Sequence, residues 1–370
     1  MNIWKKSSTL SGKQQGHSMN KKYLPIIGVL LAIAPVFALI CCLGFGRYEL
    51  SMIETCELLW AKMTGGEVDP TAYSVIFKVR LPRLILAFLT GSGLAVAGTS
   101  FQSLFGNPMA TPDTLGVATG ASFGAVLGLL FSDHMIMVQL LAFGFGLLSL
   151  LLTCLISRMN GKGSMIMVVL SGMVVSSIFQ ALVSLAKYVA DPEEELPSIT
   201  YWLMGSMSRA TGKALMIGTP FIIIGILILF ALRWRLNILS LQEDEAKALG
   251  IHVRHLRTMV MLASTMVTAS CVSMCGQVGW VGLLVPHMAR MLYGSDNRRL
   301  IPACVSIGAT FMIVIDTFAR AATASEIPVS ILTALIGVIR QIKNVFNSHF
   351  ILGYLKDVFC RQSVCFMPLG

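Results

Sequence analysis

Residues 24–42 read LPIIGVLLAIAPVFALICC, a stretch without a single charged side chain. A helix that crosses the hydrocarbon core of a bilayer needs roughly 20 predominantly apolar residues. A secretory signal peptide is the competing interpretation, but the run is too long for the apolar region of such a signal, and no small-residue cleavage site follows it. The stretch therefore predicts the first membrane-spanning helix.

The segment before this run, residues 1–23, is polar, and its basic residues are Lys5, Lys6, Lys13, Lys21 and Lys22. Lysine and arginine accumulate on the cytoplasmic side of membrane proteins, so we interpret this segment as a cytoplasmic tail. Met19 is an alternative start of the protein, because the sequence that begins there is itself typical of an N-terminus.

Further apolar runs follow along the 370 residues, of which 55% are hydrophobic and only 12% are charged. A soluble domain carries about 25% charged residues, so a soluble helical bundle is excluded. Backbone groups find no partners in lipid, which makes each spanning run a helix. The sequence predicts an all-α, polytopic membrane protein with about ten spans, at 24–45, 83–104, 113–132, 135–157, 165–188, 213–233, 256–275, 278–293, 300–319 and 328–350.

The loop charges give this bundle an orientation. With the N-terminus in the cytoplasm, alternation keeps the basic pairs Arg158/Lys162 and Arg298/Arg299 inside. The acidic loop at residues 191–195 and the segment 46–82 fall outside. The formal net charge of +10 then comes from the excess of lysine and arginine in the cytoplasmic loops. It does not indicate a surface that binds nucleic acid.

Glycines recur every four residues in the third predicted span, at Gly116, Gly120, Gly124 and Gly128. This spacing predicts one stripe along a helix, where the backbone of a neighbouring helix can approach closely. We assign these glycines a packing role and no chemistry.

Motifs for catalysis are absent from the sequence. It has neither the His-Glu-x-x-His pattern of zinc peptidases nor the Gly-x-Ser-x-Gly elbow of hydrolases. Gly161-Lys162 is not a phosphate-binding loop, because Ile156 replaces the required earlier glycine. The nine cysteines are scattered and indicate no disulfide framework or metal site. The sequence predicts no enzyme and no cofactor or metal held by this chain, so any ATP must be bound by partner subunits.

Two polar features point to partner proteins. Residues 241–251 read LQEDEAKALGI on the cytoplasmic side, which indicates either a solvated loop or a short amphipathic helix on which a cytosolic partner docks. On the outer side lie Arg80, Arg83 and Arg320. Such arginines are interface anchors or, because the guanidinium group suits carboxylates, receptors for acidic side chains of an extracellular partner.

Several ordered motifs, spread over residues 24 to 337, resemble a known family. They are the stretch Arg80-Leu81-Pro82-Arg83 with Gly91, Gly98 and Gln102, the turn Asn107-Pro108-Met109-Ala110-Thr111-Pro112 with Leu115-Gly116, the block at residues 279–290 that contains Gly282, Pro286, His287 and Arg290, and the segments 316–320, 326–329 and 333–337. These are similar to the motifs of FecCD-type permeases, related to the vitamin B12 permease BtuC. Such permeases are the membrane subunits of ABC importers for iron–siderophore complexes, haem and vitamin B12.

The resemblance implies a type II ABC importer permease in the bacterial cytoplasmic membrane, with two permease copies, identical or related, around a central pathway. It implies ABC ATPase subunits below, coupled through Glu245, Ala246, Leu249 and Gly250. It also implies an extracellular or periplasmic substrate-binding protein, often a lipoprotein, above Arg80, Arg83 and Arg320. An iron–siderophore complex is the expected cargo, with haem and cobalamin as alternatives. His287 follows a proline that recurs in the family whatever the cargo, so we expect a structural histidine.

The chain departs from the family pattern at Gln242 and Ser330, where glycine is usual, and above all after Gly337. Residues 338–370 place Arg340 and Lys343 within the last predicted span, at a cost of roughly 2.5–3.5 kcal/mol each on insertion scales. We hypothesise a shift of the reading frame near residue 338, which resequencing the end of the gene would test. An inactive, non-transporting permease is then the alternative to an importer. An ion-coupled transporter is disfavoured, because the first nine predicted spans hold almost no charge.

Overall fold

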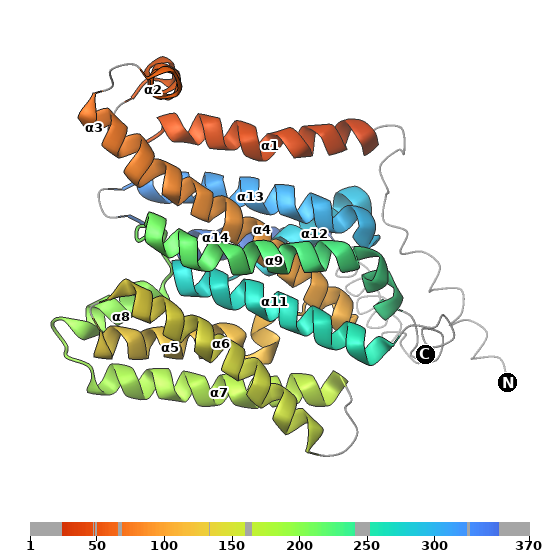
Figure 1. Cartoon of the computed structure of the whole chain (residues 1–370). Coiled ribbons are helices and arrows are strands. Elements are labelled where there is room, and N and C mark those ends of the chain that lie inside the picture. Colours follow the sequence, from red (N-terminus) through yellow and green to blue (C-terminus); the bar gives the residue numbers. More distant parts are fainter. Residues whose placement is uncertain are drawn as a thin grey trace, which may run out of the picture.

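The computed structural model describes residues 24–46, 48, 50–65, 69–132, 134–159, 165–240, 252–323 and 326–347, and every regular element within these ranges is helical (Figure 1). The predicted all-α architecture is confirmed. The main helices are α1 (Leu24–Gly44), α4 (Leu81–Phe105), α5 (Val117–Phe131), α6 (Met135–Arg158), α7 (Met165–Val189), α9 (Gly212–Leu236), α11 (Val253–Cys275), α12 (Val281–Tyr293), α13 (Asn297–Ala321) and α14 (Val329–Asn347).

These ten helices correspond to the ten predicted spans, but they differ in length. Seven of the described helical segments are long and apolar enough to cross a membrane. The remaining three, α5, α12 and α14, are short or only partly apolar. The protein is therefore a multi-pass membrane protein, and its three shorter helices pack against the longer ones.

Shorter elements connect the main helices: α2 (Met52–Thr64), α3 (Pro70–Tyr73), η2 (Ser74–Arg80), η3 (Pro112–Leu115), α8 (Glu195–Leu203) and η4 (Asn237–Ser240). The second span begins earlier than predicted, because α3, η2 and α4 form one continuous helix from Pro70 to Phe105. Its start is fixed by Asp69, whose carboxylate accepts the backbone N–H groups of Thr71 and Ala72. The segment 46–82, which the loop charges placed outside, thus contains α2 and the first turns of this long helix.

The acidic segment at the outer face is a folded turn that leads into α8. The side chain of Asp191 accepts the backbone N–H groups of Glu193 at 2.8 Å and of Glu194 at 2.9 Å. These two hydrogen bonds, that from Glu194 first, lower the pKa of Asp191, because they stabilise the charged carboxylate. This turn therefore keeps its negative charge near neutral pH.

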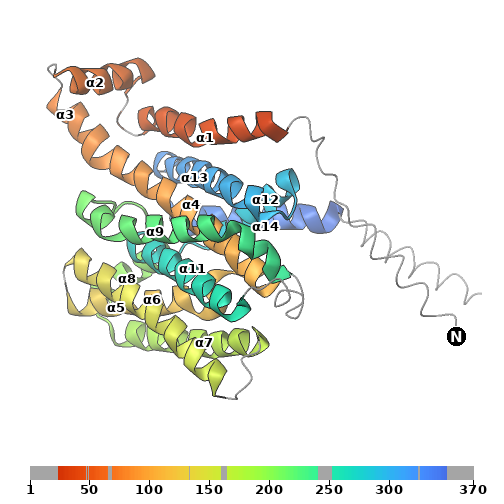
Figure 2. The ribbon, with the colours of Figure 1, turned by 45° about the vertical axis from the view of Figure 1, so that its right-hand side comes forward.

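The core of the bundle is α4, which passes between α13 on one side and α9 and α11 on the other (Figures 1 and 2). In its most apolar window 89% of the residues are buried, against 22% for the peripheral α1 and α9. Glycines make the close approach possible: a side chain at Gly91 would overlap the backbone of Gly308, and one at Gly98 would overlap that of Gly282.

A second group of helices, α5, α6 and α7, packs beside this core (Figure 2). A Cβ atom at Gly120, Gly124 or Gly128 would collide with α6, so these glycines lie in the contact between the two helices. Gly116 differs from the expected helical position, because it precedes α5 with a left-handed φ of 71°. It ends η3 and turns the chain into α5, a conformation that glycine adopts without strain.

Candidate functional site

The outer end of the bundle contains a buried cluster of charges centred on Arg83. Its Nε atom donates to both carboxylate oxygens of Asp316, at 2.9 and 3.0 Å, and its Nη1 atom donates to both oxygens of Glu326 at 2.8 Å. Arg83 is 5% exposed and Asp316 is fully buried. Such paired, hydrogen-bonded charges are the form in which ionised groups tolerate burial. The cluster joins α4, α13 and the segment before α14.

The other two outer arginines close the end of α1. Arg80 donates to the carbonyl oxygens of Leu43, Gly44 and Tyr48 at 2.8, 3.0 and 2.6 Å. Arg320 donates to the carbonyl of Cys42 at 2.6 Å. The last carbonyls of a helix lack partners within the helix and attract cations, so both side chains cap α1.

The three arginines thus lie together at the outer end, as the sequence suggested, but their guanidinium groups bind within the chain. They are between 2% and 8% exposed. Docking of a binding protein on them stays a prediction, and it requires these side chains to exchange their present partners.

Helix α7 carries a polar stripe on a face that points away from the chain. Its exposed members are Ser177, Gln180 and Ser184, at helical spacing, and Ser176 and Ala181 complete a shallow groove. The hydroxyl groups of Ser177 and Ser184 donate to the carbonyls of Met173 and Gln180 in the same helix. The amide of Gln180, however, would find no hydrogen-bond partner in lipid. This face therefore meets water or another protein. The signal was present in the sequence as polar residues at i, i+3 and i+7 within an apolar span, but it was not singled out.

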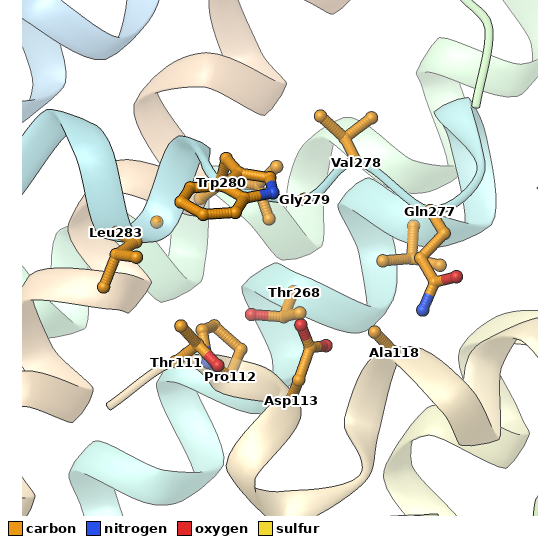
Figure 3. Close-up of a pocket in the computed structure, with 13 residues that line it drawn as sticks. Thr111, Pro112, Asp113, Ala118, Thr268, Gln277, Val278, Gly279, Trp280 and Leu283 are labelled. Carbon is orange, nitrogen blue, oxygen red and sulfur yellow. The ribbon is translucent and has the colours of Figure 1, made fainter. Parts of the chain in front are cut away.

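A cavity of about 40 Å³ lies where two interruptions of the helical bundle meet (Figure 3). One interruption is η3 with the turn before it, which contributes Thr111, Pro112 and Asp113. The other is the segment 276–280 between α11 and α12. Trp280 in this segment has a φ of 67°, the one positive value at a non-glycine residue in the described part of the chain. Such a conformation persists only where the surroundings hold it in place.

The cavity is deep in the membrane portion. Leu94, in its wall, lies about 16 Å from the inner end of α4, and Thr268 lies about 22 Å from the inner end of α11, at 1.5 Å per residue. The hydrocarbon core is about 30 Å thick. Asp113 therefore places a carboxyl group near the middle of the membrane. Sequence reasoning missed it, although it is the single charged residue between 106 and 132.

Asp113 has no hydrogen bond or ion pair from its side chain to any described residue, and its side chain is accessible from the cavity. Figure 3 shows its carboxyl group next to Thr268 and Ala118, below Trp280. The hydroxyl group of Thr268 donates to the carbonyl of Ser264 at 2.9 Å, so this donor is already engaged. The carboxylate faces open space.

The residues of the family motifs fall on both sides of this cavity. Pro112 and Gly282 line it, and the amide of Gln102 donates to the carbonyl of Gly282 at 3.2 Å. Asn107 and Pro108 form an exposed turn after α4, in which Asn107 accepts the N–H of Met109 at 2.9 Å. Pro286, His287 and Arg290 lie on α12. The described residues contain no group of His, Cys, Asp and Glu that could hold a metal ion.

Some predicted features fall outside the described residues. They are the tail at residues 1–23, the coupling residues Glu245, Ala246, Leu249 and Gly250, and residues 348–370. Within the described part, α14 continues as a helix past residue 338 to Asn347, and Arg340 donates to the sulfur of Met291 at 3.1 Å. The frameshift remains a hypothesis.

Comparisons with known proteins agree with the membrane architecture. The chain is 44% identical to the molybdate import system permease protein MolB of Haemophilus influenzae, over 84% of this chain and 90% of MolB. It is 31% identical to the hemin transport system permease protein HmuU of Yersinia pestis, over 86% and 95%. A solved structure of a metal-chelate type ABC transporter in an inward-facing conformation matches with a TM-score of 0.79 and 39% identity, over 87% and 99%.

The FecCD transport family matches residues 26–342, a range that includes Arg340 of α14 but ends before Lys343. With this match over most of the chain, the relatives above and the multi-pass helical bundle, the chain belongs to the FecCD transport family, the membrane-embedded permeases of ABC importers.

Proposed function

We propose that this permease moves a metal chelate, such as an iron–siderophore complex, haem or cobalamin, into the cytoplasm by alternating access. Two permease copies, identical or related, enclose the pathway. ATP is bound and hydrolysed by separate ATPase subunits, which act on the loop containing Glu245, Ala246, Leu249 and Gly250. A substrate-binding protein delivers the cargo at the outer end, near Arg80, Arg83 and Arg320.

The polar stripe on α7 is the observation that carries this proposal. Gln180 and its serine neighbours are exposed on a helix that is otherwise apolar on its outer surface. A face of this kind suits the wall of a water-filled path between two copies, because lipid would leave the amide of Gln180 without a hydrogen bond. The hydroxyl groups of Ser177 and Ser184 donate to carbonyls within α7 and add polarity to the same face. Neutral hydroxyl and amide groups bind a large polar cargo weakly, which permits its release.

Uptake by cells tests the proposal. A strain that carries this gene with its ATPase and binding-protein partners is compared with a clean deletion, using radio-iron-labelled siderophores, haem and cobalamin. We expect uptake that requires the gene and stops when ATP is depleted. Gln180→Leu should lower uptake several-fold, whereas Val174→Leu, on the neighbouring exposed apolar face, should not. Absence of uptake for every cargo would favour the inactive permease instead.

Molybdate is a second candidate cargo, because the relative MolB is named for molybdate import and is 44% identical. The same strains, supplied with labelled molybdate, separate the two possibilities. Uptake of molybdate alone would replace the metal chelate as the substrate class.

A further inference from the structure

Asp113 stands out among the ionisable groups of the membrane portion because no described residue pairs with its side chain. Arg83 and Asp316 satisfy one another, and Arg80 and Arg320 bind backbone carbonyls. A charged aspartate at the centre of a membrane helix costs roughly 2.5–3.5 kcal/mol on insertion scales. A packing role does not explain this residue, since its side chain is exposed and contacts the cavity rather than the core.

The backbone around Asp113 is irregular at membrane depth. Irregular backbone at membrane depth is tolerated only where protein buries it or where it lines a water-filled space. Two irregular segments, 106–116 and 276–280, meet at this point, and both line the cavity. In many secondary transporters, discontinuous helices near the bilayer midplane form the substrate site, so this meeting of two irregular segments suits contact with a cargo.

The remaining walls do not neutralise the carboxylate. Among the thirteen lining residues, all of them in the described part, there is no lysine, arginine or histidine. Gln277, Thr268 and Thr111 supply dipoles, and Trp280 supplies an aromatic face. A charge that no neighbouring cation offsets acts over several ångströms. The cavity is therefore a negatively charged position within the membrane.

We propose that Asp113 is a charge-selecting residue of the transport pathway. It admits cargo whose surface is neutral or cationic there, as in a metal chelate with exposed hydrogen-bond donors, and it opposes a free oxyanion such as molybdate. The proposal rests on the proposed import function, because selection presupposes a cargo. It also decides between the two cargo classes in favour of the chelate.

Charged thiol reagents test the electrostatic part without any transport. Gln277→Cys places a thiol in the cavity wall, and Ser177→Cys on α7 is the matched control on the exposed stripe. Each is made with Asp113 and with Asp113→Asn in the full chain, reconstituted with its partner subunits. The rates of labelling by a cationic and an anionic methanethiosulfonate are followed by tandem mass spectrometry, which separates position 277 from the native Cys275.

At position 277 we expect the cationic reagent to react at least about five times faster than the anionic one, since a nearby carboxylate attracts one and repels the other. Asp113→Asn should reduce this ratio to about that of the control, while the ratio at position 177 stays unchanged. Dividing one rate by the other removes any effect of the carboxylate on thiol reactivity. An unchanged ratio in Asp113→Asn, or no labelling at 277 when 177 is labelled, would overturn the proposal.

Uptake supplies the second readout. Asp113→Asn should raise molybdate uptake relative to chelate uptake, and a wild-type protein that prefers molybdate would contradict the selectivity. If no cargo is transported, the import function fails, yet the labelling ratio still decides whether position 113 sets the charge of the cavity. The two failures are therefore distinguishable.

Discussion

The outer charge cluster and the mid-membrane cavity both hold a carboxylate within the bundle, but they treat it in opposite ways. Asp316 is fully buried and accepts two hydrogen bonds from Arg83. Asp113 is exposed to a cavity and accepts none from the described residues through its side chain. Paired charges connect helices that are distant in sequence, whereas an unpaired charge adds nothing to stability and must be retained for another reason. Substitutions at the two sites test this contrast, because we expect a loss of folding stability at Asp316 and almost none at Asp113.

Asp316→Ala should have the largest effect. It leaves the buried guanidinium of Arg83 with Glu326 alone, and breaking a buried ion pair costs about 3–5 kcal/mol. We expect a loss of about 3 kcal/mol, the low end of that range, because Glu326 remains. The unfolding free energy from SDS titration in mixed micelles is the measurement.

The double variant Arg83→Met/Asp316→Leu serves as the control for this prediction, since apolar replacement of a whole buried pair is often neutral. It should be more stable than Asp316→Ala alone. If Asp316→Ala unfolds like the wild type, the cluster does not hold α4 and α13 together.

Gly98→Ala should lower the unfolding free energy by an intermediate amount. Gly98 lies on α4, which connects the outer charge cluster to the cavity. A Cβ atom there would overlap the backbone of Gly282, which lines the cavity. Overpacking of this kind costs about 1–3 kcal/mol. Gly144→Ala on α6 is the matched control, because a Cβ atom at Gly144 would meet nothing within 4 Å. Equal unfolding free energies for the two variants would contradict close packing of α4 on α12.

Asp113→Asn should have the smallest effect on stability. The carboxylate loses no partner, so the unfolding free energy should change by less than about 0.5 kcal/mol, as for substitutions away from specific contacts. The unfolding free energies of Asp113→Asn and Asp316→Asn are compared by SDS titration in mixed micelles. A loss at position 113 as large as that at position 316 would mean that Asp113 has a structural partner, and the distinction between the two regions would disappear.

Sequence patterns predicted the membrane helices well where the signal is local. The runs that became α1, α6, α7 and α11 are long and predominantly apolar, so their windows of high hydropathy locate them. The second span was placed too late, because Arg80 and Arg83 were interpreted as its outer end although the helix starts at Pro70. Arg80 is tolerated in this helix because it binds the carbonyls at the end of α1, which no local pattern reveals.

The candidate site was harder to predict for the same reason. The three outer arginines were recognised by type and position, but not their partners. Asp113 lies inside a recognised motif, yet only the meeting of two irregular segments gives its carboxyl group a cavity. The stripe on α7 could have been found from its helical spacing. The coupling loop, in contrast, depends on the sequence alone, because it lies outside the described residues.

By itself the sequence determined that the chain crosses a membrane as helices and to which family its motifs belong, and it predicts an orientation from the loop charges. These properties depend on the transfer of short segments from water to lipid and on the charge of adjacent loops, so neighbouring residues suffice. Only the tertiary structure decided which charges are neutralised. Arg83 meets Asp316 across 233 residues of sequence, and Asp113 meets no partner in the described chain, because pairing depends on which helices pack together.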